Sequence, residues 1–309
     1  MTESVRWETI NCPICSSKNH NKWRTVRDRF DVVPGQEFTI VYCEDCGFRF
    51  LNPRPDPESV RQFYEPDGYD PFLSTKDKFS IADSLYSIAR SFSMWRKRLL
   101  IEDFHRSGNL LDVGCGTGEF PRYMQGFQWH VAGVEPAERA REFVASQGIQ
   151  ICESLMDVPT REYDVVTLWH VIEHLHDLDN AVQKLSVLTK PGGHLVLAMP
   201  NVEAYDARRY QTNWVALDTP RHLYHFTEPD TVKLFRQTAF RLVDTRSLWL
   251  DTIYNVLYSE QLYHRWEHKR YRPFFMLNAV FGSYLNDWQQ PMRQASASVY
   301  IFQKEETNA

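Results

Sequence analysis

Apolar residues in the middle of the chain form short runs that alternate with segments of helical spacing. The runs predict buried strands at 109–114, 130–135, 149–152, 163–168 and 194–199. The segments between them predict helices at 122–125, 137–147 and 178–188. Two more strands are expected at 240–247 and 298–303. Because strands that alternate with helices form parallel sheets covered on both faces, we expect an α/β, doubly wound fold with a mostly parallel seven-stranded sheet.

The flanking regions have different patterns. Residues 76–105 carry apolar side chains at every third or fourth position, which predicts a long helix. Prolines are too dense at 53–58 for a helix interior and indicate a linker. A helical, aromatic insertion is expected at about 250–290, near the C-terminus. These changes predict an N-terminal module over 1–52, a linker with helices over 53–106 and a main domain over 107–309.

Composition and charge restrict the class of protein. Of 309 residues, 43% are hydrophobic and 24% charged, which is typical of a folded globular chain. The net charge of −5 argues against nucleic acid as a partner and favours a small molecule. There is no run of about 18 apolar residues, so no transmembrane helix is expected. The first residues lack the apolar core of a signal peptide, and we expect a cytoplasmic location.

Four of the six cysteines form two close pairs. Cys12 and Cys15 make one Cys-x-x-Cys pair, and Cys43 and Cys46 make the other after a gap of 27 residues. Two such pairs can surround one tetrahedral zinc ion, and a hairpin through 38–42 would fill the gap between them. Four thiolates leave no open coordination position, so we expect a structural zinc-binding module.

A glycine-rich turn follows the first predicted strand of the main domain. Gly114, Gly116 and Gly118 stand there, and glycine lets a backbone approach a ligand closely. Glu135 comes 19 residues after Gly116, at the end of the next strand, where a carboxylate can accept hydrogen bonds from ribose hydroxyls. Asp112 precedes the first glycine, which differs from a dinucleotide fingerprint and suits a cationic ligand with an amino group.

The segment from Asp112 to Gly118 resembles motif I of class I, Rossmann-like methyltransferases that use S-adenosylmethionine, and Glu135 resembles their ribose-binding acid. The resemblance covers about 107–309. It implies that the three glycines line the methionine part of the cofactor, with Asp112 close by and Glu135 on the ribose. It also implies that Glu153 and Ser154 contact the adenine, although the usual Gly-Asp pair is missing there.

The sequence His170-x-x-Glu173-His174 follows the fourth predicted strand of the main domain. On a helix, two histidines four residues apart could hold zinc with the glutamate as base, which is an alternative zinc-hydrolase function. The segment also resembles the same point in ubiquinone-biosynthesis O-methyltransferases. That resemblance implies that His170 lies beside the cofactor, while Glu173 and His174 face the methyl acceptor.

A second histidine cluster follows the fifth strand and precedes a helix expected near residue 227. We expect Trp214, Arg221 and His225 to bind the acceptor with Glu173, because the carboxyl edge of a parallel sheet is where ligands bind. His222 and His174 are the candidate bases, since a histidine pKa lies near the working pH. The loop resembles that of methyltransferases with an N-terminal zinc module, often linked to polysaccharide or glycan biosynthesis.

The methyl acceptor is expected to be a small molecule with a hydroxyl group, such as a sugar or glycan intermediate. Aromatic faces pack on sugar rings, and an arginine can hold a phosphate or carboxylate. A phenol or quinone-type acceptor is the alternative, and a binding module without catalysis is a third. The aromatic insertion could act as a lid, pack against a second subunit or contact a membrane surface.

Overall fold

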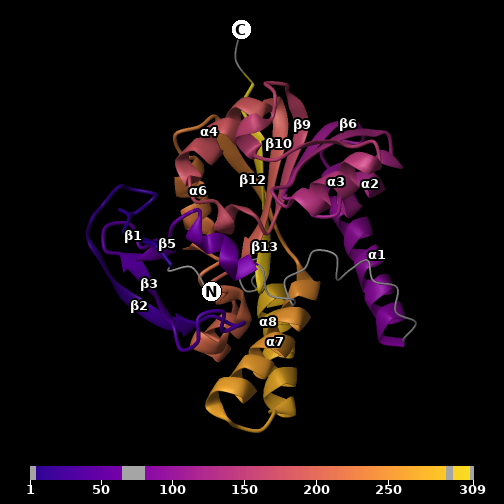
Figure 1. The fold of residues 1–309 in the computed structure, drawn as a ribbon. Coiled ribbons are helices and arrows are strands. Elements are labelled where there is room, and N and C mark those ends of the chain that lie inside the picture. The colour runs from indigo at the N-terminus through magenta and orange to yellow at the C-terminus, as the bar shows by residue number, and fades with distance from the viewer. Residues whose placement is uncertain (1–4, 65–80, 290–294, 307–309) are drawn as a thin grey trace.

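The computed structural model describes residues 5–64, 81–289 and 295–306, apart from the side chains of 81–89 and 287–289. A seven-stranded sheet lies at the centre, with helices on both faces (Figure 1). Its strand order is β12-β13-β10-β9-β6-β7-β8, and the five strands from β10 to β8 are parallel. β13 is antiparallel to both of its neighbours. The expected α/β fold with a mostly parallel seven-stranded sheet is confirmed.

The central strands are β6 (Gly108–Val113), β7 (Trp129–Val134), β8 (Gln150–Cys152), β9 (Tyr163–Trp169), β10 (Thr189–Pro200), β12 (Phe240–Ser247) and β13 (Ala297–Lys304). Six of these strands match their predicted bounds to within one residue. β10 is the exception, because it begins at Thr189 and not at the predicted residue 194. Thr189 pairs with Tyr163 before a register shift. A Cβ on Gly193 would lie only 3.0 Å from the Asp164 carbonyl oxygen, so glycine lets this irregular stretch approach β9.

Helices cover the sheet as its parallel strands require. In Figure 1, α2 (Glu119–Gln125) and α3 (Glu138–Ser146) lie on one side, near α1 (Ile81–Glu102), and α4 (Leu178–Leu188) and α6 (Glu228–Phe235) lie on the other. α1 accounts for most of the helix expected at 76–105, of which 76–80 fall outside the described residues. α6 starts with a capping box between Thr227 and Asp230, which satisfies free backbone N–H groups.

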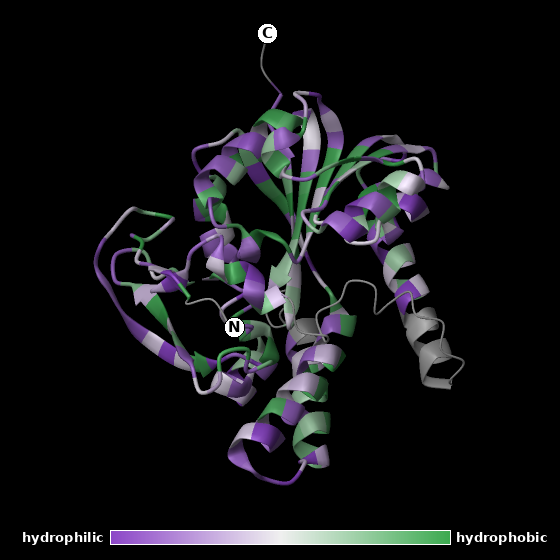
Figure 2. Ribbon diagram, in the orientation of Figure 1, coloured by the Kyte–Doolittle hydropathy of each residue, from purple (hydrophilic) through white to green (hydrophobic). Residues whose placement is uncertain are grey.

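Two long helices lie between β12 and β13 and form a helical hairpin: α7 (Trp249–Glu267) and α8 (Pro273–Gln289). The short helix α5 (Tyr205–Tyr210) packs against both. α8 exposes large apolar side chains, with Phe274 86% exposed and Phe281 64% exposed, and Figure 2 shows hydrophobic and hydrophilic residues interleaved along this hairpin. Within the described parts of the chain, no helix is long and apolar enough to cross a membrane.

The N-terminal region folds around short antiparallel strands: β1 (Trp7–Glu8), β2 (His20–Arg27), β3 (Glu37–Cys43), β4 (Arg49–Leu51) and β5 (Arg54–Pro55). β2, β3 and β4 form one sheet, and β1 pairs with β5. The sheet is extended by β11 (Tyr224–His225), which pairs with β4. The backbone hydrogen bonds of this module therefore cross the expected boundary at residue 52 and reach the loop that carries the second histidine cluster.

Candidate functional site

The turn after β6 adopts a backbone that only glycine accepts readily. Gly114, Gly116 and Gly118 have φ angles of 72°, 55° and 73°. A Cβ on Gly114 would collide with the Val171 side chain, and one on Gly118 would lie 2.8 Å from Val144. The turn therefore packs closely against the segment after β9 and against α3, and its backbone lies at the carboxyl ends of the parallel strands.

Glu135 follows β7 and closes this turn from the other side. Its Oε2 accepts a hydrogen bond from Gly116 N at 2.8 Å, and its Oε1 accepts one from Ala137 N at 2.9 Å. Burial raises the pKa of Glu135, although the two backbone donors favour the charged form. Each carboxylate oxygen keeps a second lone pair, so Glu135 can still accept hydrogen bonds from ligand hydroxyls.

Asp112 lies at the end of β6, two residues before Gly114, and it is buried. Its Oδ1 accepts a hydrogen bond from Thr167 Oγ1 at 2.6 Å. Burial raises the pKa of Asp112 to about 7, against the lowering effects of Thr167 and Lys97. A cationic ligand beside this carboxyl would favour its ionised form, so the position suits a positively charged molecule.

Glu153 and Ser154 follow β8 at the same edge of the sheet. The Glu153 side chain is exposed and lies 3.2 Å from Arg141 Nη2. Ser154 caps the short helix Leu155–Asp157 by accepting a hydrogen bond from Met156 N at 3.1 Å. The Ser154 hydroxyl therefore has a structural partner, and the Glu153 carboxylate remains accessible from solvent.

These residues fit S-adenosylmethionine, which is a cation that carries a ribose. Buried carboxyl groups at Asp112 and Glu135 flank the turn, and a Cβ on Gly116 would meet no atom within 4 Å, so the space beside this glycine is open. Glu135 accepts two backbone hydrogen bonds and can accept more from the ribose hydroxyls of the cofactor. The positive sulfonium and amino groups of the cofactor complement the acidic side chains around the turn.

His170 follows β9 with a left-handed φ of 58° and links this loop to α7. Its Nε2 lies 2.8 Å from Asp251 Oδ2, and its Nδ1 lies 3.6 Å from Glu173 Oε1. Burial lowers the pKa of His170, but the hydrogen bond with Asp251 and the nearby charge of Glu173 outweigh this effect and raise the pKa to about 10. His170 is therefore an imidazolium that holds α7 against the edge of the sheet.

Glu173, His174 and His222 converge beyond His170. Glu173 and His174 belong to a short 3-10 turn, Ile172–His174, and His222 comes from the loop before β11. One possible ligand atom from each of the three lies within 4.8 Å of the other two. The rings of His174 and His222 are 4.7 Å apart and nearly perpendicular, at 77°. The fold thus brings the two candidate bases and a carboxylate into one buried cluster.

His225 lies on β11 and is buried, 4% exposed. Among the described residues, its Nε2 has no hydrogen-bond partner. Burial, assisted by the nearby His222, lowers the pKa of His225 to about 3. The ring is therefore neutral at ordinary pH and packs where β11 joins the N-terminal sheet.

Two residues expected to bind the acceptor have structural partners instead. Arg221 is fully buried, and its Nη2 lies 2.6 Å from Asp28 Oδ1 and 2.7 Å from Asp218 Oδ1. Trp214 is 1% exposed, and its Nε1 donates to Asp206 at 2.7 Å. In this structure protein groups therefore occupy the guanidinium and cover the indole, so neither side chain presents the open fork or face that was expected for a ligand.

The four paired cysteines come together in the N-terminal module. Their sulfur atoms all lie within 4.8 Å of one another, and the Cys12–Cys46 and Cys15–Cys43 pairs are each 3.5 Å apart. Bonds of about 2.3 Å to a tetrahedral zinc ion space sulfur atoms by about 3.8 Å. Disulfides need about 2.05 Å, so the spacing fits a metal and not a disulfide.

Several residues that contact the candidate site, at the carboxyl edge of the central sheet, were not predicted from the sequence. Asp251 contacts His170 from 81 residues away, and Thr167 bonds to Asp112 from a different strand. Asp28 lies 193 residues before the arginine that it contacts. The positions of these residues in the sequence follow no regular period. Each one meets its partner only when the sheet and the N-terminal module have packed.

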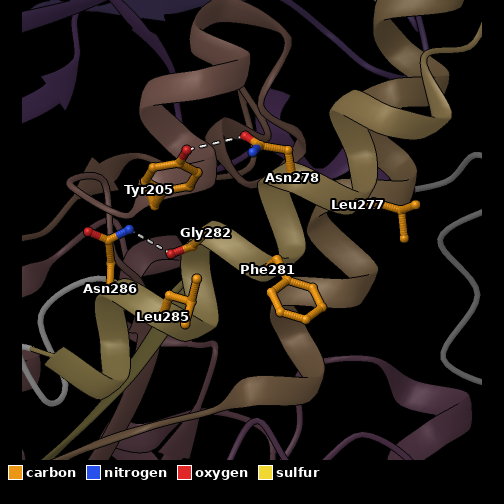
Figure 3. A pocket seen from close by; sticks show the side chains of 7 residues that line it. All are labelled: Tyr205, Leu277, Asn278, Phe281, Gly282, Leu285 and Asn286. Atoms are coloured by element: carbon orange, nitrogen blue, oxygen red, sulfur yellow. Dashed lines mark hydrogen bonds between the residues drawn. The ribbon is translucent and has the colours of Figure 1, made fainter.

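A surface hollow lies away from this edge of the sheet. It has a volume of about 590 Å³ and is formed by α5 and α8, with Tyr205, Asn278 and Phe281 among its lining residues (Figure 3). Tyr205 donates a hydrogen bond to Asn278 Oδ1 at 3.3 Å across it. None of the residues predicted for the cofactor or the acceptor lines this hollow, so it is separate from the candidate site.

The sheet order, the glycine turn and the acid after the second central strand define a Rossmann-like methyltransferase fold. A family model described as a methyltransferase domain matches residues 85–245, about half of the chain. The chain therefore belongs to this family.

Relatives with assigned names match shorter segments. A ubiquinone biosynthesis O-methyltransferase from Pectobacterium atrosepticum is 33% identical over 105 residues, which cover 31% of this chain and 44% of that protein. One from Vibrio cholerae is 32% identical over 108 residues, covering 31% and 44%. The chain therefore spans less than half the length of these relatives.

Among solved structures, phosphoethanolamine N-methyltransferase 2 of Haemonchus contortus, in complex with phosphomonomethylethanolamine and S-adenosylhomocysteine, superposes with a TM-score of 0.50. The match covers 93% of this chain and 68% of that chain, at 15% identity. At this identity the likeness supports the fold alone.

The zinc-hydrolase alternative is wrong. The His170–His174 segment forms a 3-10 turn after a left-handed residue, so the two histidines do not share the face of an α-helix. His170 Nε2 contacts Asp251, while His174 groups with His222. Together with the family match, this geometry excludes the arrangement that the hydrolase pattern requires.

Proposed function

We propose that this enzyme transfers a methyl group from S-adenosylmethionine to a hydroxyl oxygen of a small molecule, with a sugar or glycan intermediate as the acceptor. The observation that carries the proposal is the buried cluster of Glu173, His174 and His222 beside the glycine turn. Val171, in the same segment as Glu173, packs directly on Gly114. A group bound in the cluster would therefore lie next to the predicted cofactor position.

In this proposal the cofactor is held by residues at the carboxyl edge of the sheet. Gly114, Gly116 and Gly118 line its methionine part, Asp112 complements its positive charge and Glu135 accepts from its ribose. Glu153 and Ser154 lie at its adenine end, and His170 lies beside it. When bound, S-adenosylmethionine supplies an electrophilic methyl carbon attached to a good, neutral leaving group.

The chain must then free a lone pair on the acceptor oxygen. His222 Nδ1 lies 2.9 Å from the Ala216 carbonyl oxygen, so Nδ1 carries the proton and Nε2 presents a lone pair. Burial lowers the pKa of His222, which keeps the ring neutral at ordinary pH. His222 Nε2 would take the hydroxyl proton as the oxygen bonds to the methyl carbon, with His174 as the second candidate base.

Helix α7 supports the proposed acceptor class. It is tied to the site through Asp251 and His170, and it carries the exposed rings of Trp249, Tyr254 and Tyr258. Tyr254 and Tyr258 pack with ring centroids 4.3 Å apart. Such rings offer flat apolar faces to a sugar, and α7 with α8 would act as a lid that excludes water. Contact with a second subunit or with a membrane surface is the alternative role for this hairpin.

A phenol or quinone-type acceptor is the second candidate. The relatives named ubiquinone biosynthesis O-methyltransferases favour it, and the same aromatic rings suit it. The loop that carries His222 resembles, less specifically than the glycine turn does, that of methyltransferases with a zinc module linked to glycan biosynthesis. This resemblance favours a sugar as the methyl acceptor.

We also propose that Cys12, Cys15, Cys43 and Cys46 bind one structural zinc ion in a module over residues 1–52. Residues 53–106 would connect this module to the methyltransferase domain at 107–309. The sulfur spacing and the burial of Cys12 and Cys43 support the site.

A substrate panel tests the proposal. Nucleotide sugars and phenols are offered to the purified protein, and release of S-adenosylhomocysteine is measured. Turnover of a hydroxylated sugar supports the first acceptor class, whereas turnover of phenols alone overturns it. With an accepted substrate, His222→Ala should lower turnover by about 10² to 10⁴. The matched control His130→Ala, at an exposed position of β7, should leave turnover unchanged.

A further inference from the structure

We infer that Glu173, His174 and His222 form a binding site for a divalent first-row transition-metal ion, separate from the cysteine site. The three residues offer two imidazoles and one carboxylate from two separate segments of the chain. Nothing in the family match or in the names of the relatives assigns a metal to them. The inference rests on the proposed function only where it concerns the acceptor hydroxyl.

Backbone carbonyls contact Nδ1 of both histidines, which leaves Nε2 of each for a ligand. His174 Nδ1 lies 3.0 Å from the Arg221 carbonyl oxygen, and His222 Nδ1 lies 2.9 Å from the Ala216 carbonyl oxygen. A carbonyl only accepts, so Nδ1 of His222 carries the hydrogen and its Nε2 is an acceptor. His174 Nδ1 also lies 2.9 Å from the Tyr64 hydroxyl, and the same tautomer holds at His174 when that hydroxyl accepts. An imidazole that donates its other N–H to a backbone carbonyl is the arrangement that orients histidine ligands in metal sites.

The carboxylate of Glu173 is the second, independent observation. Glu173 is 1% exposed, yet within the described residues neither of its side-chain oxygens accepts a hydrogen bond. The nearest recorded cationic atom, His170 Nδ1, lies 3.6 Å from Oε1, which is too long for a hydrogen bond. A buried carboxylate without donors is costly, and a bound cation would remove that cost.

The spacing and the donor types define the class of ion. Metal–ligand bonds of about 2.1 Å place neighbouring donors about 3 to 4 Å apart, and the three donors already lie within 4.8 Å of one another. Neutral imidazole and carboxylate suit Mn²⁺, Fe²⁺, Co²⁺ or Zn²⁺ better than they suit Mg²⁺ or Ca²⁺, which prefer oxygen donors alone. Three protein ligands leave coordination positions open.

An open position gives the metal a role in the proposed reaction. A hydroxyl oxygen bound to the ion becomes more acidic, as bound water does. Because His222 Nε2 would then be a ligand, the hydroxyl proton would pass to the second carboxylate oxygen of Glu173. The freed oxygen lone pair forms the bond to the methyl carbon as the carbon–sulfur bond breaks, so charge and atoms balance.

The test uses Co²⁺ added to the purified full-length protein that already holds its zinc. Calorimetry counts the ions bound, and visible absorption shows whether thiolates are among the ligands. We expect one equivalent of Co²⁺ without thiolate absorption in the wild type. Glu173→Gln and His222→Gln should each lose this equivalent, whereas the exposed control His130→Gln should retain it. Absence of a Co²⁺ site, or a site with thiolate absorption alone, overturns the inference.

A measurement on the wild type covers the case in which the variants fail to fold. Pulsed electron paramagnetic resonance of bound Mn²⁺ should detect nitrogen from imidazole, and a signal without nitrogen coupling overturns the site. The two proposals also fail separately. If hydroxyl compounds are methylated while no ion binds the cluster, only the metal inference falls. If Co²⁺ binds as expected and no hydroxyl compound is methylated, the proposed function falls and the metal site stands.

Discussion

Arg221 Nη2 donates a hydrogen bond to Asp28 Oδ1 over 2.6 Å, and both side chains are buried although 193 residues separate them in the chain. The guanidinium also contacts Asp218 and donates from Nη1 to the Phe63 carbonyl oxygen at 2.9 Å. Its own backbone oxygen accepts from His174. One arginine therefore joins the N-terminal module to the histidine cluster.

Because of this connection, a substitution at Asp28 tests how much the buried ion pair between the N-terminal module and the histidine loop contributes to stability. Asp28→Asn removes the charge that faces a fully buried guanidinium. It keeps one oxygen that can accept from Phe30 N, but its amide nitrogen cannot accept the hydrogen bond that Val32 N donates to the second oxygen in the wild type. We expect a loss of about 2 to 4 kcal/mol in the free energy of unfolding, less than for an unpaired charge because Asp218 remains. Urea titration measures it.

The matched control lies in the same module. Glu37→Gln breaks an exposed pair in which Arg27 Nε lies 3.8 Å from Glu37 Oε1, so we expect a loss below about 1 kcal/mol. Equal losses in the two variants would show that the buried network contributes no more than a surface pair.

The cysteine cluster predicts one zinc ion held by four sulfur atoms. Cys43→Ala should lose this zinc because three thiolates leave the tetrahedral site open. The loss should also lower the melting temperature, since β3 and β4 hold β11 in the same sheet. Metal analysis by mass spectrometry gives the stoichiometry. Cys152→Ala, outside the cluster, is the control and should keep the zinc, and zinc retained in Cys43→Ala would place the ion elsewhere.

Glu135 should contribute to cofactor affinity. Glu135→Ala removes the carboxylate that organises Gly116 and would accept from ribose, so the free energy of binding S-adenosylhomocysteine should weaken by about 1 to 3 kcal/mol. Calorimetric titration measures this change. Glu138→Ala, at an exposed position three residues later on α3, should bind as the wild type does. Unchanged affinity in Glu135→Ala would remove Glu135 from the ribose site.

A pair of histidines on the opposite side of the domain predicts acid sensitivity. His194 Nδ1 lies 2.8 Å from His105 Nε2, and burial, with the nearby His105, lowers the pKa of His194 to about 4. The unfolded chain binds a proton near pH 6.5 and the folded chain does not, so stability falls as pH decreases from 6.5 toward 4.

His194→Gln keeps a hydrogen-bonding side chain and removes this titration. Between pH 7 and pH 5, the wild type should lose about 1 to 2 kcal/mol more in the free energy of unfolding than the variant. Denaturant titrations at the two pH values measure the difference. Parallel losses in both proteins would show that His194 does not titrate differently in the folded and unfolded states.

Much of the fold follows from local patterns. The alternation of apolar runs and helical spacing determines the parallel sheet, and the strand ends carry the glycine turn and Glu135 to one edge, because carboxyl ends of parallel strands lie together. The spacing of four cysteines likewise determines a compact cluster. These features are readable because each depends on residues close in the chain or on the regular geometry of parallel strands.

The acceptor region depends instead on contacts between distant segments. Only packing of the N-terminal module and α7 decides that Arg221 faces Asp28, that His170 faces Asp251 and that Trp214 is covered. Polar residues in a loop look alike in sequence whether they face a ligand or a buried partner. The difference is burial, and burial is set by which surfaces meet when the whole chain folds.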